Sequence, residues 1–164
     1  MFSSLAAGIG RFLALTTIAF WAASAAAAPV GPFVGLGGVW SGHGQIHLSD
    51  GSKENLRCRA TYQVDVGGKA MHQVLRCASD NYNFELRSDV ESQGEQISGN
   101  WSELTRSLGG KLSGQARRGR IEVRVQSDIF NAVVTLMSLG DVQTVTISSP
   151  GSQINGVAIS LRRS

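Results

Sequence analysis

The sequence predicts an all-β fold: an antiparallel up-and-down β-barrel of about eight to ten short strands with one disulfide. Three observations predict it. Short segments in which apolar and polar residues alternate follow one another along the chain, and turn residues separate them. No segment keeps the 3.6-residue apolar period of a helix. The turns are tight and sequential, which favours a meander closed into a barrel over a sandwich.

Ten alternating segments make up the body of the chain. Each ends at residues that favour turns, such as Asp50-Gly51 after the first and Pro150-Gly151 before the last. The stretch 129–139 is the most ambiguous, because one helical turn also fits it. The segments are 39–49, 55–65, 69–78, 82–90, 96–106, 111–116, 120–126, 132–138, 142–149 and 155–162.

The pairing of the second and third segments can be tested against the cysteines. A two-residue turn at Gly67-Gly68 places Cys58 directly opposite Cys77 and puts alternate apolar residues on one inner face. In that turn type the two cysteines form a hydrogen-bonded pair, which a disulfide fits with more strain, so a one-residue bulge is expected. A second tight turn at Ser79-Asp80 then pairs Tyr82 with Cys77.

The first segment of the chain predicts export. Residues 1–27 have one charge, Arg11, then an apolar run and a small-residue cleavage site ending at Ala27, which is typical of a secretory signal peptide. An uncleaved membrane anchor is the alternative, although the apolar run is short for a span. Residues 28–37 follow as a linker and 38–164 as a single barrel domain.

The cysteines agree with an oxidising compartment. Two cysteines in the exported part predict a disulfide rather than a metal site. The expected location is therefore the periplasm or the extracellular space. After cleavage the protein is not expected to be integral to the membrane, because the chain lacks the aromatic girdles of outer-membrane barrels.

Composition and charge exclude several classes. The chain is 42% hydrophobic and 16% charged, which argues against intrinsic disorder. Its formal net charge of +3 comes without a concentrated basic face, so no nucleic-acid partner is expected. His43 and His47 share a strand face but lie about 13 Å apart, too far to bind one metal ion. His72 can join only one of them, so no metal and no cofactor are predicted.

The run Gly38-Val39-Trp40 resembles the G-x-W that opens the first strand of the lipocalin-like (calycin) barrels. In those proteins a basic residue of the last strand packs over the tryptophan near the closed end. The resemblance implies that Arg162 or Arg163 has that role here. It implies a barrel more than a ligand, and Trp40 either fills the core or bounds a cavity.

The chain also resembles small exported alphaproteobacterial proteins of unknown function. The resemblance lies in the runs Gly38-Val39-Trp40-Ser41-Gly42, Leu56-Arg57-Cys58-Arg59-Ala60-Thr61-Tyr62, Leu75-Arg76-Cys77-Ala78-Ser79 and Val157-Ala158-Ile159-Ser160-Leu161. It implies no activity.

The large inner residues are candidates for the wall of a ligand cavity. If the barrel is small, they fill it instead. Gly42 and Gly44 would leave space near the disulfide, which favours a cavity. The candidates are Trp40, Tyr62, Met71, Leu75, Phe84 and Trp101.

Arginines form the second candidate site. The predicted register places Arg59 opposite Arg76, and like charges there need Glu85 or an external anion to offset them. Other arginines surround the turn at Gly119. A solvated charged surface is the alternative in both places. The anion-binding candidates are Arg57, Arg59, Arg76, Arg117, Arg118 and Arg120.

Catalysis has little support, because no nucleophile motif is present and the histidines lack an orienting acid. Glu103 is the one acid that could face the interior beside Trp101, although a surface position is expected. The sequence therefore predicts an exported, non-enzymatic barrel that binds a small apolar ligand or an anionic envelope polymer. The alternative is a structural or protein-interaction module of the cell envelope with a filled core.

Overall fold

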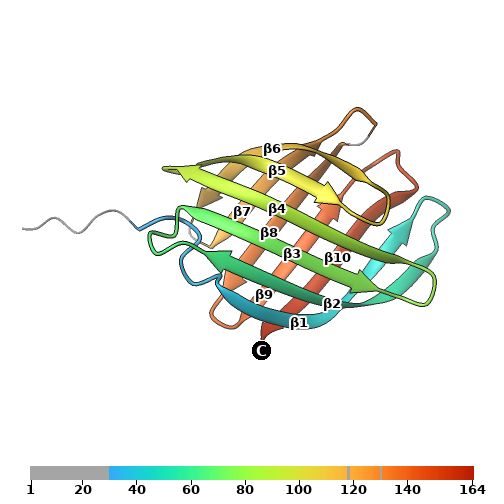
Figure 1. The fold of residues 1–164 in the computed structure, drawn as a ribbon. Coiled ribbons are helices and arrows are strands. Elements are labelled where there is room, and N and C mark those ends of the chain that lie inside the picture. Colours follow the sequence, from blue (N-terminus) through green and yellow to red (C-terminus); the bar gives the residue numbers. More distant parts are fainter. Residues whose placement is uncertain (1–29, 118, 130) are drawn as a thin grey trace, which may run out of the picture.

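The computed structural model describes residues 30–164 except 118 and 130. Its ten antiparallel strands close into a barrel in which each strand pairs with its neighbours in sequence and β1 pairs with β10 (Figure 1). This confirms the predicted up-and-down barrel. The strands are β1 (Gly38–Leu48), β2 (Lys53–Val64), β3 (Ala70–Ala78), β4 (Asn83–Gln93), β5 (Gln96–Glu103), β6 (Leu108–Arg117), β7 (Arg120–Gln126), β8 (Asn131–Leu139), β9 (Val142–Ser148) and β10 (Ile154–Arg163).

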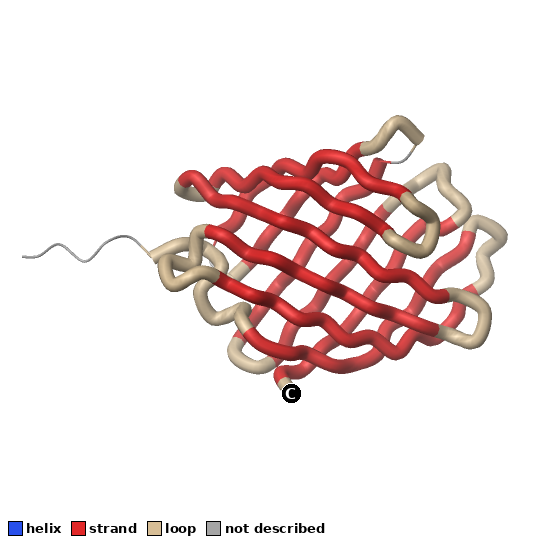
Figure 2. Tube along the Cα trace, in the orientation of Figure 1, coloured by secondary structure: helices blue, strands red, loops and turns tan. Residues whose placement is uncertain are grey.

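The described part of the chain contains strands and connections only (Figure 2). The ambiguous stretch 129–139 is strand from Asn131 onward rather than a helical turn. No helix in the described residues is long and apolar enough to cross a membrane. The expected signal peptide, residues 1–27, lies outside the described residues.

The two ends of the barrel differ. At one end lie the chain entry into β1, the exit from β10, and the β2–β3, β4–β5, β6–β7 and β8–β9 connections. Residues 30–37 were expected to be a linker, yet they bring Phe33 (0% exposed) and Leu36 (4% exposed) into the core at this closed end. The other end carries the remaining connections, which are longer than those of the closed end apart from the β2–β3 connection.

The β2–β3 register agrees with the prediction, and Cys58 lies opposite Cys77. The turn between these strands is not the predicted two-residue type. Asp65 closes it by donating its N–H to the Ala70 carbonyl (3.0 Å), and only Gly68 has a positive φ, of 67°. The longer loop has the same centre as the predicted turn, so every cross-strand pair is preserved.

The longer turn also changes the type of site that holds the disulfide. Along an antiparallel pair of strands, hydrogen-bonded and non-hydrogen-bonded residue pairs alternate. Counted from the closing pair Asp65–Ala70, the Cys58–Cys77 pair lies at a non-hydrogen-bonded position. Their Cα atoms lie 4.2 Å apart, near the roughly 4.5 Å of such positions. The expected bulge is therefore absent from β2–β3.

The predicted β3–β4 register was wrong by two residues. Cys77 pairs with Phe84 rather than with Tyr82, because residues 79–82 all belong to the turn. The Ser79 hydroxyl accepts the Tyr82 N–H (2.9 Å), and the Ser79 N–H donates to the Tyr82 carbonyl (2.7 Å). A shift of two residues leaves every side chain on its predicted face, since strand side chains alternate with period two.

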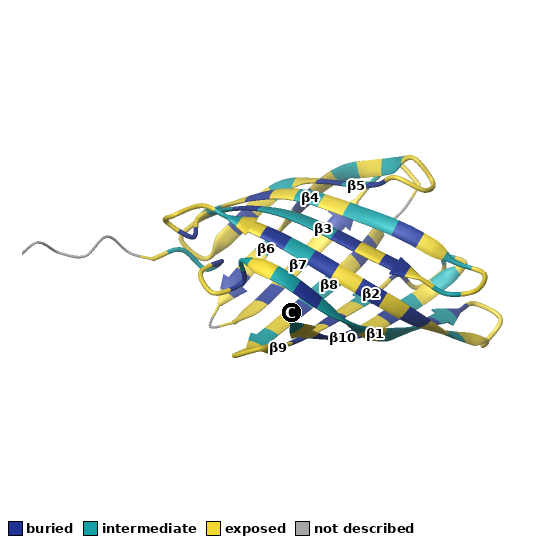
Figure 3. Cartoon of the chain, turned by 60° about the horizontal axis from the view of Figure 1, so that its bottom comes forward, coloured by how far each residue is buried: buried dark blue, intermediate teal, exposed yellow. Residues whose placement is uncertain are grey.

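Burial alternates along the strands, with inward side chains buried and outward ones exposed (Figure 3). Gly42 shows what closing the barrel requires. A Cβ atom there would lie 2.0 Å from the Ser160 carbonyl oxygen of the paired strand β10. Gly42 thus allows two backbones to approach, and the expectation that Gly42 and Gly44 leave empty space near the disulfide was wrong.

Candidate ligand cavity at the open end of the barrel

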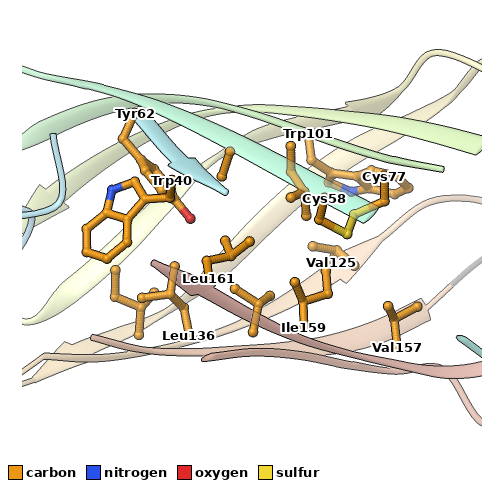
Figure 4. Packing of buried hydrophobic residues seen from close by; sticks show 14 of the residues in the cluster. Trp40, Cys58, Tyr62, Cys77, Trp101, Val125, Leu136, Val157, Ile159 and Leu161 are labelled. Carbon is orange, nitrogen blue, oxygen red and sulfur yellow. A yellow bond between two sulfur atoms is a disulfide. The ribbon is translucent and has the colours of Figure 1, made fainter. Parts of the chain in front are cut away.

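The closed end has the arrangement that the calycin resemblance implies. Trp40 is fully buried, and its indole Nε1 donates to the Leu36 carbonyl (2.9 Å). Figure 4 shows Trp40 beside Tyr62 at one end of the core, with Trp101 near the disulfide at the other. Trp40 therefore belongs to the packed floor of the barrel.

Arg163 is the basic residue that covers Trp40. Its guanidinium carbon lies 4.3 Å from the indole ring centroid. The same group donates to the Gly37 carbonyl (2.5 Å) and to the Gly35 carbonyl, and it pairs with Asp141 (3.1 Å). Arg163 thus ties the last strand to the segment that enters the first one.

A second polar pair lies in this floor. The Tyr62 hydroxyl donates to Gln143 Oε1 (2.6 Å), and burial raises the pKa of Tyr62 well above its ordinary value despite that hydrogen bond. Gln143 Nε2 is buried without a hydrogen-bond partner in the described part of the chain.

The main cavity lies toward the open end and has a volume of about 170 Å³. Its walls are mostly apolar side chains of β4 to β10, and its rim includes the β5–β6 and β9–β10 connections. The apolar lining consists of Phe84, Leu86, Trp101, Leu108, Leu112, Val123, Val125, Val134, Ile147, Ile154 and Val157.

A smaller cavity of about 50 Å³ lies between the main cavity and the closed end, and Phe33 of the N-terminal segment lines it. The two cavities share several lining residues. Three of these are apolar, and the other two, Gln73 and Ser88, are polar. Ser88 Oγ donates to Gln73 Oε1 (3.2 Å), so a hydrogen-bonded pair lies where the cavities meet. The shared apolar residues are Leu112, Val123 and Val134.

Glu103 lies at the rim of the main cavity and is 6% exposed, so the expected surface position was wrong. Its carboxylate accepts the backbone N–H groups of Thr105 (3.0 Å), Arg106 (2.7 Å) and Glu85 (3.2 Å). Burial by itself would raise the pKa of Glu103, but these backbone donors together hold it below its ordinary value. Glu103 therefore organises the β5–β6 connection as a carboxylate.

Arg106 lies beside Glu103 at the rim, and 40% of its side chain is exposed. Its guanidinium lies 3.7 Å from the Glu103 carboxylate and makes a long contact of 3.4 Å with the Asn83 carbonyl. The charged residues that line the main cavity are thus Glu103, Arg106 and Arg87, and Arg87 pairs with Glu85 (2.6 Å).

The structure distributes the predicted cavity residues over three places. Phe84 and Trp101 line the main cavity, and Met71 lines the smaller one. Trp40, Tyr62 and Leu75 are buried and line neither.

The prediction missed the wall formed by β6 to β10. It favoured aromatic and large side chains, whereas this wall is formed by smaller residues such as Val123, Val125 and Val134. Their period-two alternation in the sequence was the available signal. The polar pair Gln73–Ser88 was also missed, although the predicted register already placed Gln73 on the inner face.

In the described part of the chain, ion pairs are formed by three of the six arginines predicted to bind anions: Arg76, Arg117 and Arg120. Arg59 does lie opposite Arg76, and Arg76 Nε donates to Glu85 (2.8 Å). Glu85 also pairs with Arg87 (2.6 Å). The hydrogen bonds from Arg76 and then Arg87 lower the pKa of Glu85 to about 2.

The arginines around Gly119 are also paired. Arg117 contacts Glu95 (2.6 Å) and Arg120 contacts Glu122 (2.7 Å), while Arg118 lies outside the described residues.

Two of the arginines predicted to bind anions, Arg57 and Arg59 on β2, have no ion-pair partner among the described residues. Arg162 on β10, which was not predicted to bind an anion, has none there either. In the strand registers Arg59 and Arg162 both lie opposite Ser41, which places them on either side of β1.

The histidines do not converge. His72 contacts Asp89 (2.7 Å) on the outer face, and His43 and His47 lie on β1. Among residues 30–164, leaving aside 118 and 130, no three His, Cys, Asp or Glu side chains lie close enough together to hold a metal ion.

Neither a family model nor a curated protein matches this sequence. Several solved structures share the fold, and two of them illustrate the likeness. One is Rv2717c from M. tuberculosis, with a TM-score of 0.62 and 10% identity over 81% of this chain and 93% of that chain. The other is the S-type phycobiliprotein lyase CPES from Guillardia theta, with a TM-score of 0.53 and 11% identity over 78% of this chain and 88% of that one. The protein therefore has a calycin-like barrel.

Proposed function

We propose that the protein is an exported, non-enzymatic barrel that binds a small apolar ligand in its main cavity. One observation carries the proposal: a space of about 170 Å³ with an almost entirely apolar lining lies beneath the end of the barrel that the N-terminal segment leaves uncovered. Binding sites for small molecules are typically concave and apolar with a few polar groups, as this one is.

The volume limits the size of the ligand. An engineered protein cavity of about 150 Å³ binds benzene, whereas drug-sized ligands need roughly 300 to 1,000 Å³. The main cavity of about 170 Å³ therefore suits one substituted ring or an aliphatic chain. Such a chain would have about six to eight carbons.

Two further observations support the proposals that the protein is not an enzyme and that it is exported. The two serine hydroxyls of the main-cavity lining donate to the Gln73 amide oxygen and to the Asn131 carbonyl rather than to a base, which supports a non-enzymatic role. The Cys58–Cys77 disulfide is typical of an oxidising compartment, in agreement with the signal-like pattern of residues 1–27.

Ethylbenzene tests the cavity directly, in a calorimetric titration of residues 28–164. Val134 lines both cavities, while the neighbouring Val133 lies on the outer face and is 37% exposed. We expect Val134→Phe to fill the space and abolish binding, and Val133→Phe to leave binding unchanged. Absence of ethylbenzene binding by the unaltered protein would refute the proposed function.

Native mass spectrometry of the protein produced from the full chain tests export and retention of a natural ligand. The expected mass is that of residues 28–164 less two hydrogens, with an adduct that disappears in Val134→Phe. A mass that includes residues 1–27 would contradict cleavage.

A second candidate function is binding of an anionic envelope polymer to the outer face around β1. The observation in its favour is that Arg57, Arg59 and Arg162 lack ion-pair partners among the described residues. Dextran sulfate is a suitable probe, because its binding should weaken steeply with added salt. We expect Arg57→Gln/Arg59→Gln to lose this binding and Arg117→Gln, at the closed end, to keep it. Equal binding by both variants would exclude this surface.

A further inference from the structure

The interior of the barrel contains a polar pair that the packing of the core does not require. Gln73 on β3 and Ser88 on β4 lie directly opposite each other in the strand register. Both are half-buried, and both line the main cavity and the smaller cavity below it. The pair therefore lies at the neck between two apolar spaces.

The hydrogen bond between Ser88 and Gln73 leaves the amide nitrogen of Gln73 without a partner among the described residues. Ser88 Oγ donates to Gln73 Oε1 (3.2 Å), which occupies the amide oxygen. The amide nitrogen Nε2 carries two N–H donors, and neither has a partner in the described part of the chain. Gln73 Nε2 is not sealed in the core but is open to the cavity that Gln73 lines, so its N–H groups are available to an acceptor on a ligand.

We propose that Gln73 Nε2 donates a hydrogen bond to an oxygen atom of the ligand, with the apolar body of the ligand filling the main cavity above it. This inference rests on the proposed function and adds the ligand class: a neutral, largely apolar molecule with one hydrogen-bond-accepting oxygen at one end, such as a ketone, aldehyde or ester.

The charge of the surroundings explains why the oxygen is neutral. Binding a ligand carboxylate at the neck would move its charge from water into apolar surroundings. The Gln73 amide is a neutral donor, and a hydrogen bond from one neutral donor does not offset that desolvation cost. Two arginines line the main cavity, and each has an acidic partner: Arg106 lies 3.7 Å from Glu103, and Arg87 lies 2.6 Å from Glu85. The rim therefore does not select an anion either.

Two probes of nearly equal size separate this inference from the proposed function. Ethylbenzene and acetophenone both carry one ring and two further carbons, but only acetophenone has an acceptor oxygen. We expect acetophenone to bind about tenfold more tightly, since it forms one additional hydrogen bond, to an amide donor of the cavity wall.

Variants locate the effect at the neck. Gln73→Leu should lower acetophenone affinity to that of ethylbenzene without weakening ethylbenzene binding. Gln63→Leu, a matched change on the outer face of β2, should change neither affinity. In ¹⁵N–¹H spectra the Gln73 side-chain amide signals, assigned by their absence in Gln73→Leu, should shift with acetophenone and not with ethylbenzene.

Each outcome decides between the proposals. Equal affinities for both probes, or a preference for acetophenone that survives in Gln73→Leu, would overturn the role of Gln73 and leave the ligand cavity intact. Binding of neither probe would overturn the cavity itself. If Gln73→Leu fails to fold, Gln73→Leu/Ser88→Ala removes both members of the pair and serves the same comparison.

Discussion

Glu103 shows how a single side chain shapes the mouth of the barrel. A carboxylate inside a protein needs partners for its lone pairs, and here backbone N–H groups of the β5–β6 connection and of β4 supply them. The chain turns sharply next to it, and Ser107 takes a positive φ of 52°. Glu103 thus holds in place a turn that forms part of the rim of the cavity.

This role predicts a pH dependence. The pKa of Glu103 is below its ordinary value in the folded protein, so its contribution to stability is complete above the unfolded pKa of about 4.3 and is lost as the pH falls through the lower folded pKa. We expect Glu103→Gln to unfold about 1–3 kcal/mol more easily at pH 7, and this difference to shrink toward pH 3.

Urea unfolding of both proteins at several pH values measures the effect. Glu122→Gln, in an exposed ion pair with Arg120, controls for the loss of one negative charge. A difference between Glu103→Gln and the unaltered protein that stays constant from pH 7 to pH 3 would contradict this account.

Arg163 has a comparable role at the opposite end. It contacts the Trp40 ring and donates to two backbone carbonyls of the segment that plugs the barrel. We expect Arg163→Ala to lower the free energy of unfolding by about 2–3 kcal/mol, from a lost cation–π contact and lost hydrogen bonds. Arg162→Ala removes the exposed neighbour and should change it by less than about 0.5 kcal/mol. Equal effects in urea titrations would argue against this role of Arg163.

At the scale of elements, β2 and β3 show that the sequence determines the register of two paired strands more firmly than the type of turn between them. Alternation, the glycines and the two cysteines each predicted the same register, because a slip by one residue would turn the whole inner face outward. The turn itself was predicted wrongly, since the Asp65 carboxylate accepts the Lys69 and Ala70 N–H groups and so favours a longer loop. The β3–β4 register failed for a similar reason: the Ser79 hydroxyl stabilises a wider turn.

The cavity was less predictable than the strands. Alternation tells which residues face inward, but not whether inward side chains meet across the barrel. Trp40 and Tyr62 pack at the closed end and Leu75 is buried without lining either cavity, while the valines of β7 and β8 are too short to fill the middle. Glu103 was misplaced because a lone acid in a strand usually faces solvent, and its backbone partners depend on the shape of the turn.

The disulfide predicts how strongly the β2–β3 hairpin is held. Cys58 and Cys77 are 19 residues apart, and closing a loop of that length is worth about 3 kcal/mol in the loop-entropy model. We expect the reduced protein and Cys58→Ala/Cys77→Ala to unfold about 3 kcal/mol more easily than the oxidised protein in urea. The reduced protein is the matched control, since it keeps both sulfur atoms. If only the double variant loses stability, lost packing rather than the crosslink is responsible.

At the scale of the whole molecule, the barrel combines a packed closed end with a hollow open half. The tryptophan, the arginine of the last strand and the N-terminal segment close the floor, and the disulfide joins β2 to β3 toward the other end of the core. Side chains that face an empty volume lack contacts on that side, and each missing contact lowers stability. The empty volume is therefore a feature that reduces stability and makes room for a ligand.

This trade-off yields a prediction in which stability and binding move in opposite directions. Val134→Phe extends a side chain into the space shared by both cavities, and we expect it to raise the free energy of unfolding by about 1–2 kcal/mol through added apolar burial. Val133→Phe places the same ring on the outer face and should change it by less than about 0.5 kcal/mol. Ethylbenzene at 100 times its dissociation constant should stabilise the unaltered protein by about 2.7 kcal/mol and leave Val134→Phe unchanged. A Val134→Phe protein that is less stable than the unaltered one would mean that the barrel interior is already filled at this position, and the hollow half would not exist in solution.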